Sequence, residues 1–287
     1  MPPGSRWGSV ARRGASGLSR PYEGGRDDAA GVGYGRNAPA NGDAGTSVER
    51  WERQPDQDER KSSSTPKGHP AGPRRQRQLS LPDDVAAELR VLAGPRRSEW
   101  ISKRMTAAVV AYDRDHYAEA RQILDPLAKE VPDSPTVREL YGLVLYRLGR
   151  WRKAAKELEA FHRLSGSFDQ HPAIADCERV LGNHRAAEER LEQLRRASPG
   201  ADLLAEGRLV LAGSYADRGK LDDAIALLER HARPLRHPTL RHLRTWYALA
   251  DLYERAGELP KARQLFSRVA SYDPDLGSAQ QRASGLT

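Results

Sequence analysis

A small residue recurs five times along the last two-thirds of the chain, at nearly constant spacing. The five residues are separated by 34, 33, 37 and 38 positions, and they are Ala120, Ala154, Ala187, Ala224 and Ala262. A period of this length is typical of repeat proteins in which each helical hairpin buries its apolar face against its neighbours. The spacing therefore predicts an all-α solenoid.

The last copy of the repeat, residues 243–276, shows why each position has its residue type. Ala250 and Ala262 are small because two helices that pack as a hairpin approach to about 8–10 Å. Gly257 lies where the first helix ends and a left-handed backbone is favoured, and Pro274 stops the second helix. Larger side chains are predicted to fill the space beside the crossing, and these are Trp246, Leu249, Tyr253, Phe266 and Val269.

Four earlier copies keep this order of residue types, around residues 101–134, 135–168, 168–201 and 205–238. The order is aromatic, Leu, small, aromatic, Gly, Ala, Phe, apolar and Pro, and it resembles the tetratricopeptide repeat (TPR) family. Residues 141–143, 146–151 and 175–179 are also similar to uncharacterised actinobacterial TPR proteins. The resemblance implies a right-handed superhelical solenoid of about five TPR-like helical hairpins, with a groove lined mainly by the first helix of each hairpin.

Two of the copies depart from the pattern. In the first, Asp115 replaces the turn glycine, and Pro126 is expected to interrupt the second helix. In the third, Glu178 stands where an apolar or aromatic residue is usual. We expect these departures to alter the local register of the two hairpins and to leave the architecture unchanged.

Composition, together with the positions of Gly and Pro residues that end helices, divides the chain into four predicted parts. The first part is rich in Gly, Arg, Pro and Ser, and it has too few large apolar residues to offset the entropy of ordering its backbone. In the second part, Val85 and Leu89 recur at helical spacing before Gly94 and Pro95 end the run. The parts are a disordered extension over 1–80, an N-terminal capping helix over 81–96, the repeat domain over 97–276 and a short C-terminal tail over 277–287.

A search for catalytic or metal-binding residues finds no complete set. Cys177 is the only cysteine, so no intrachain disulfide or CxxC motif is available. His171, Asp176 and His184 lie near it, but Cys177 is predicted on the inner side of a first helix and His184 beyond its end. The motifs of zinc proteases, P-loop proteins, serine hydrolases and dinucleotide-binding enzymes are missing from any supporting context. We expect no enzyme activity, no cofactor and no bound metal.

The single cysteine also favours a reducing compartment, and no stretch approaches the roughly 18 apolar residues that span a bilayer. We therefore expect a cytoplasmic protein without a membrane segment.

The groove implied by the TPR resemblance is the predicted functional surface. Its mixture of charged residues and tyrosines suits a peptide or a partner protein, so the leading hypothesis is a non-catalytic interaction scaffold or adaptor. The candidate groove residues are Glu139, Leu143, Tyr146, Asp176, Arg179, Glu206, Leu209, Arg244, Tyr247 and Asp251.

An alternative hypothesis is an RNA- or ribosome-associated factor that uses the basic N-terminal extension. The chain carries a formal net charge of +8, and residues 24–26 (Gly-Gly-Arg) and 33–36 (Gly-Tyr-Gly-Arg) are similar to arginine-glycine RNA-binding tails. The densest basic run of the repeats offers a second phosphate-contacting surface, although Arg150, Lys153 and Glu157 share one helix face with compensating charge. This run contains Arg147, Arg150, Arg152, Lys153, Lys156 and Arg163.

A third possibility is self-association. Only residues 277–287 follow the last repeat, and a solenoid end that is incompletely capped exposes the surface on which another repeat would stack.

Overall fold

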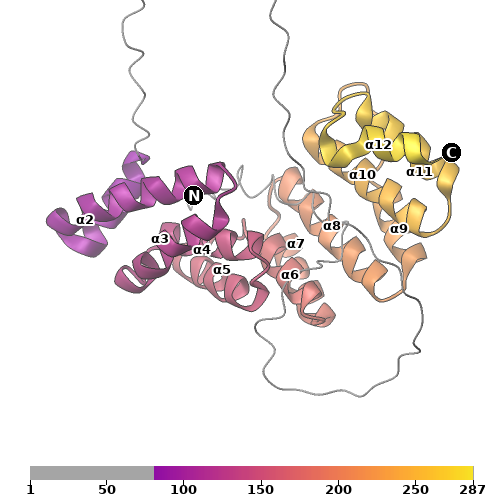
Figure 1. The fold of residues 1–287 in the computed structure, drawn as a ribbon. Helices are drawn as coiled ribbons and strands as arrows, with labels where there is room; N and C mark the ends of the chain where they lie inside the picture. Colours follow the sequence, from indigo (N-terminus) through magenta and orange to yellow (C-terminus); the bar gives the residue numbers. More distant parts are fainter. Residues whose placement is uncertain (1–80, 287) are drawn as a thin grey trace, which may run out of the picture. The chain divides into compact units, whose positions relative to one another are not determined.

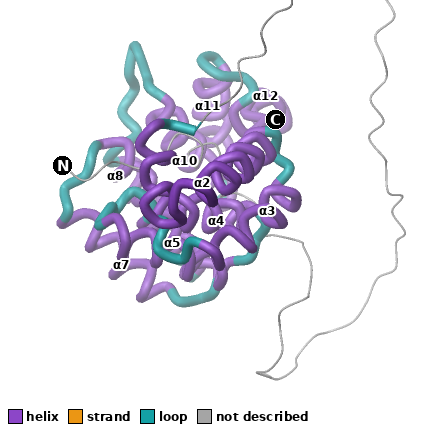
Figure 2. Tube along the Cα trace, turned by 90° about the vertical axis from the view of Figure 1, so that its left-hand side faces the viewer, coloured by secondary structure: helices purple, strands orange, loops and turns teal. Residues whose placement is uncertain are grey.

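The structure, a computed structural model, describes residues 81–286, and within them every regular element is a helix. The disordered extension predicted for residues 1–80 lies outside the described residues. Figures 1 and 2 show helices joined by short loops. The elements are α2 (Asp83–Asp113), α3 (Tyr117–Glu130), α4 (Pro135–Arg147), α5 (Trp151–Ser165), α6 (His171–Val180), α7 (His184–Arg196), α8 (Ala201–Asp217), α9 (Leu221–Glu229), α10 (Leu240–Arg255), α11 (Leu259–Ala270), the 3-10 turn η2 (Leu276–Ser278) and α12 (Ala279–Gly285).

The helices pack as five consecutive hairpins, which confirms the predicted helical-repeat solenoid. The pairs are α2 with α3, α4 with α5, α6 with α7, α8 with α9 and α10 with α11. The first helices also meet across the hairpin boundaries, since α8 packs against both α6 and α10. All five periodic alanines are buried, with at most 1% of their surface exposed. Small residues at these positions therefore allow the two helices of each hairpin to approach closely, as the spacing predicts.

Each hairpin turns through the same hydrogen-bonded motif. In the second hairpin, Gly149 has φ +69°, its N–H donates to the Tyr146 carbonyl at 3.0 Å, and the Arg150 N–H donates to the Leu145 carbonyl at 2.9 Å. This pair of bonds is the Schellman motif, which satisfies the last carbonyls of a helix. The same two bonds recur in the other four hairpins, where the left-handed residues are Asp115, Gly182, Gly219 and Gly257. The first hairpin thus keeps the turn geometry although Asp115 replaces glycine.

The prediction that Pro126 interrupts the second helix of the first hairpin is wrong. Helix α3 runs without a break from Tyr117 to Glu130, with Pro126 inside it. Proline removes one backbone donor and crowds the preceding turn, but here the flanking Leu124 and Leu127 are fully buried and hold the helix against its neighbours.

The two ends of the repeat array are covered by additional helical segments. At the N-terminal end, α2 has non-helical backbone angles at Gly94, so the residues of α2 before this kink form a separate helical segment, with Val85 and Leu89 fully buried. At the C-terminal end, the predicted short tail forms η2 and α12, and α12 packs against α11. Ala279 and Ala283 of α12 belong to the same apolar cluster as Phe266.

Within residues 81–286, no helix is both long enough and apolar enough to cross a membrane.

Candidate functional site

The ten candidate groove residues all lie on the first helices of the second to fifth hairpins, α4, α6, α8 and α10. We call the surface formed by these helices the first-helix face. All ten residues are buried or half-buried, and none is freely exposed. Each polar member has partners, and many of these partners lie one hairpin away in the chain.

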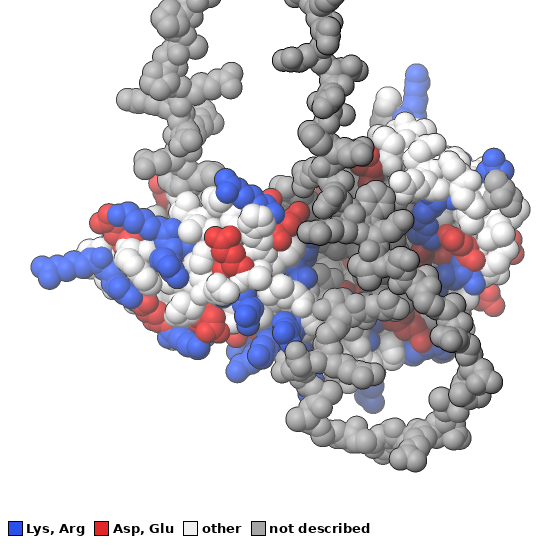
Figure 3. All heavy atoms as spheres, in the orientation of Figure 1, with Lys and Arg blue, Asp and Glu red and all other residues white. Residues whose placement is uncertain are grey.

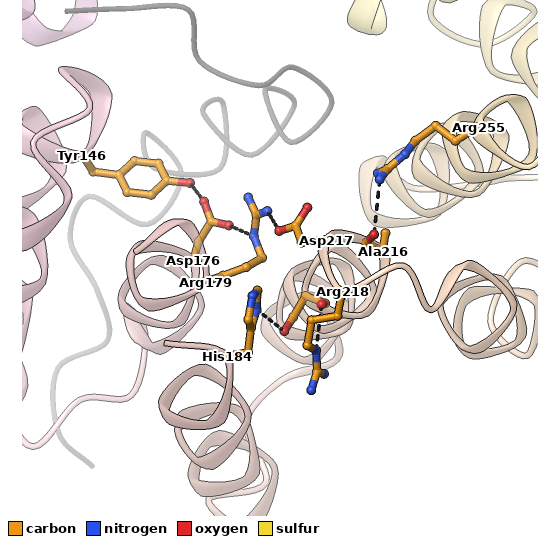
Figure 4. A network of polar contacts seen from close by, with 9 residues as sticks. Tyr146, Asp176, Arg179, His184, Ala216, Asp217, Arg218 and Arg255 are labelled. Atoms are coloured by element: carbon orange, nitrogen blue, oxygen red, sulfur yellow. Dashed lines mark hydrogen bonds and ion pairs between the residues drawn. The ribbon is translucent and has the colours of Figure 1, made fainter. Parts of the chain in front are cut away.

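A continuous polar network crosses the first-helix face from α4 to α8 (Figure 4). The Tyr146 hydroxyl donates to the Asp176 carboxylate at 2.5 Å, and the second oxygen of this carboxylate accepts from Arg179 Nε at 2.8 Å. Arg179 also donates through Nη1 to Asp217 at the end of α8. The structure thus brings together three of the candidate residues and adds Asp217.

Tyr146 is fixed as a neutral hydrogen-bond donor in this network. Burial raises the pKa of its hydroxyl well above the ordinary value, and the negative charge of Asp176 raises it further. The ring of Tyr146 packs edge-on against Trp151, with 5.4 Å between ring centroids. These contacts give Tyr146 a positioning role in the scaffold.

Two further candidates on α4 are buried. Leu143 is part of the apolar core, with 2% of its surface exposed. Glu139 accepts a hydrogen bond at 2.8 Å from the side-chain amide of Gln170, which immediately precedes α6. Buried carboxylates are costly unless their oxygens are satisfied, so this bond contributes to holding α4 against the third hairpin.

The candidates near the C-terminal end contact the last helix of the chain. The Tyr247 hydroxyl donates to the Gly277 carbonyl at 2.6 Å and accepts from Arg282 Nη1 at 3.0 Å. Arg282 Nη2 donates to Asp251 at 2.9 Å and also pairs with Glu254. Tyr247 and Asp251 therefore help to hold α12 against the C-terminal end of the repeat array.

The remaining candidates line a pocket at the start of α8 and α10. Glu206 and Leu209 come from α8 and Arg244 from α10, and the pocket has a volume of about 130 Å³. Arg244 Nη1 donates to Glu206 at 2.9 Å, with 7% and 17% of the respective side chains exposed. The other residues of the lining are Asp202, Ala205, Thr239, Leu240 and Arg241. We call this the α8–α10 pocket.

The suspected metal-ligand residues are not brought together. Cys177 is fully buried, and burial, followed by the charge of Asp176, raises the pKa of its thiol well above the usual range. His171 packs against the ring of His162, whereas His184 Nδ1 lies 3.1 Å from the Ser214 hydroxyl. Among residues 81–286, no group of three or more His, Cys, Asp and Glu side chains is arranged to hold a metal ion.

Several residues that contact or belong to the first-helix face were missed by the sequence-based prediction. Asp217, Gln170 and Arg282 complete the bonds of candidate residues, and Leu240 contributes an exposed apolar side chain to the pocket. Asp217 could have been found from its position two residues before the turn glycine. The others lie just outside the periodic helix positions, where the repeat pattern predicts no side-chain direction.

Comparison with known proteins identifies the fold independently. The sequence profile of the tetratricopeptide repeat family matches residues 105–166, 173–237 and 235–276. The crystal structure of a thermophilic TPR protein from Thermus thermophilus superposes with a TM-score of 0.52 at 18% sequence identity, and the match covers 65% of this chain and 98% of that one. No curated protein sequence matches this chain. The profile covers more than half of the sequence, and the matched residues form the hairpins described above. The chain therefore belongs to the tetratricopeptide repeat family.

Proposed function

We propose that this protein is a non-catalytic scaffold that binds a peptide segment of a partner protein on its first-helix face, at the α8–α10 pocket. The observation that carries the proposal is the convergence of Glu206, Leu209 and Arg244 on one pocket. A repeat architecture of this family supports an interaction role, since stacked hairpins offer an extended surface for a partner.

The lining of the pocket suits one apolar side chain of an extended or helical peptide. Ala205, Leu209 and Leu240 supply apolar surface, and 46% of the Leu240 surface is exposed at the rim. Apolar pockets of this kind, bordered by polar residues, are the usual seats of the anchor residues that dominate binding energy.

The charged groups at the pocket are held in place before any partner binds. Glu206 pairs with Arg244, and Asp202 pairs with Arg241 at 2.7 Å. Both pairs connect α8 to α10, so they fix the spacing of the two helices. A pre-ordered lining lowers the entropic cost of binding, which favours a defined peptide over non-specific adhesion.

The proposal is tested on a purified partner obtained by affinity capture with the full chain. We expect the substitution Leu240→Glu to weaken the interaction by at least about tenfold, because it places a charge in the apolar anchor site. Leu259→Glu is the matched control, because Leu259 is similarly exposed, at 41%, but lies on the second helix α11.

The two variants separate the pocket from general surface effects. Unchanged affinity of the Leu240→Glu variant, or equal losses for both variants, would show that the partner does not use the α8–α10 pocket. Circular dichroism on both proteins checks that the fold is retained.

A further inference from the structure

A second surface lies on α5, which is the second helix of the second hairpin, and its positive charges are not compensated by ion pairs with other described residues. Helix α5 exposes Arg152, Lys153, Lys156 and Arg163, and we call this set the α5 basic face. Within the described part of the chain, none of these four cations forms an ion pair. Figure 3 shows basic side chains along the lower margin of the described residues, with acidic side chains between them, and further basic side chains elsewhere on this face.

The two acidic residues of α5 are removed from this face by partners on other helices. Glu157 pairs with Arg138 of α4, and the two side chains are only 12% and 18% exposed. Glu159 pairs with Arg190 of α7, with 27% and 20% of the side chains exposed. The prediction that Glu157 compensates the cations of α5 is therefore corrected, because its charge is directed to Arg138.

The spacing along the helix places three of the cations in one row. Arg152, Lys156 and Arg163 are separated by four and seven residues, so they lie on the same side of an α-helix. With a rise of about 1.5 Å per residue, the row is about 16 Å long. Such a row matches an extended chain of negative charges better than a single small anion.

The character of the face argues against a membrane or a conventional protein interface. The apolar side of α5, formed by Ala154, Leu158 and Phe161, is buried inside the solenoid and cannot insert into lipid. Among the described residues of α5, no aromatic side chain is exposed: Trp151 is half-buried and Phe161 is buried, whereas Leu164 beside Arg163 is 42% exposed. Electrostatic attraction is therefore the interaction that this face offers a ligand, as in proteins that contact a nucleic-acid backbone.

We propose that the α5 basic face binds the phosphate backbone of single-stranded RNA without reading its sequence. RNA is favoured over other polyanions because the same chain holds the arginine-glycine pieces at residues 24–26 and 33–36, whose chemistry suits unpaired bases and phosphates. The surface lies on a second helix and is distinct from the α8–α10 pocket, so the inference is independent of the proposed peptide site.

The test measures binding of the full chain to a fluorescein-labelled oligouridylate of about 20 nucleotides by fluorescence anisotropy over a range of salt concentrations. The variant R152Q/K156Q/R163Q is expected to bind at least about tenfold more weakly at low salt, and the slope of log affinity against log salt is expected to fall in magnitude by about 2. A charge-retaining variant, R152K/R163K, is expected to bind like the unaltered chain.

The matched control is R185Q/R195Q/R196Q on α7, which removes the same formal charge. These three arginines are exposed but are already paired, with Glu189 for the first and Glu192 for the other two. We expect the control to stay within about threefold of the unaltered chain, because its cations are neutralised locally.

Each of the following results would overturn the inference. They are no measurable RNA binding by the full chain, equal loss in the α5 and α7 variants, and tighter binding of phosphatidylserine vesicles than of RNA with the same dependence on the α5 cations. If the residues of the extension alone bind RNA, the α5 variant will match the unaltered chain, and this outcome also rejects the α5 site.

Discussion

At the scale of single residues, Gly142 lies at a close contact between α4 and α5. A Cβ atom at Gly142 would lie 2.5 Å from Leu158 Cδ2 and 3.2 Å from the Leu158 backbone nitrogen. We expect Gly142→Ala to lower the free energy of unfolding by about 1 to 3 kcal/mol, because the crossing has no room for a methyl group. Urea denaturation measures the change.

The control for this prediction is Gly213→Ala on α8. There the added Cβ would meet the Arg179 side chain at 3.5 Å, which is an ordinary contact. Alanine is also the better helix former, so the control is expected to be neutral or more stable by up to about 1 kcal/mol. A Gly142→Ala variant as stable as Gly213→Ala would contradict the close crossing.

His171 is the residue whose burial predicts a pH dependence. Burial and the neighbouring His162 lower the pKa of His171 to about 4, against 6.5 for an ordinary histidine. Between these values the unfolded chain binds the proton and the folded chain does not, so stability is lost as the pH falls. From pH 7 to pH 5 the free energy of unfolding is expected to drop by about 1 to 2 kcal/mol through this group.

The variant His171→Phe isolates this contribution, because it keeps an aromatic ring in the buried site and removes the titrating group. Its stability is expected to change less between pH 7 and pH 5 than that of the unaltered protein. Parallel pH profiles for the two proteins would show that His171 does not carry the effect.

At the scale of elements, α12 is bonded to α10 through the side chain of Arg282. Arg282 bonds to Tyr247 and Asp251, and its guanidinium carbon lies 4.2 Å from the centroid of the Phe266 ring. We expect Arg282→Gln to lower stability by about 1 to 3 kcal/mol, because it removes charge-assisted hydrogen bonds and leaves Asp251 without its cation. Hydrogen exchange should become faster in α12 and in the adjoining part of α10.

Arg263→Gln is the control for α12, since Arg263 is exposed on α11 and has no ion-pair partner among residues 81–286. It should leave exchange in α12 unchanged. Equal protection of α12 in the Arg282→Gln variant would mean that apolar packing alone holds this helix.

The sequence predicted features within one hairpin, whereas it did not predict the contacts between elements. Hairpin turns were predictable, because Gly149 and Gly257 meet a local backbone requirement that repeats with the period. The bonding partners of the candidate residues were not predictable. Tyr146 bonds to Asp176, thirty positions later, and Tyr247 bonds to the C-terminal tail, which has no repeat pattern. The helix period tells which residues share a face, whereas their bonding partners depend on how neighbouring hairpins pack.

At the scale of the whole described molecule, the polar contacts between hairpins link neighbours along the chain. Arg179 and Asp217 are 38 residues apart, Arg190 and Glu159 are 31 apart, and Arg241 and Asp202 are 39 apart. Each separation is close to one repeat. Stability in such an array is approximately a sum over single hairpins and their nearest interfaces, so the α8–α10 pocket depends mainly on the fourth and fifth hairpins.

The central claim is that a partner binds at the α8–α10 pocket, and site-specific photo-crosslinking tests it most directly. A photoreactive phenylalanine analogue replaces Leu240 at the rim of the pocket in one protein and Leu259 on α11 in another. Both positions are partly exposed, so both probes are tolerated by the fold. The account predicts a crosslink to the purified partner from position 240 and none from position 259. Crosslinking from position 259 alone, or to the same extent from both positions, would contradict it.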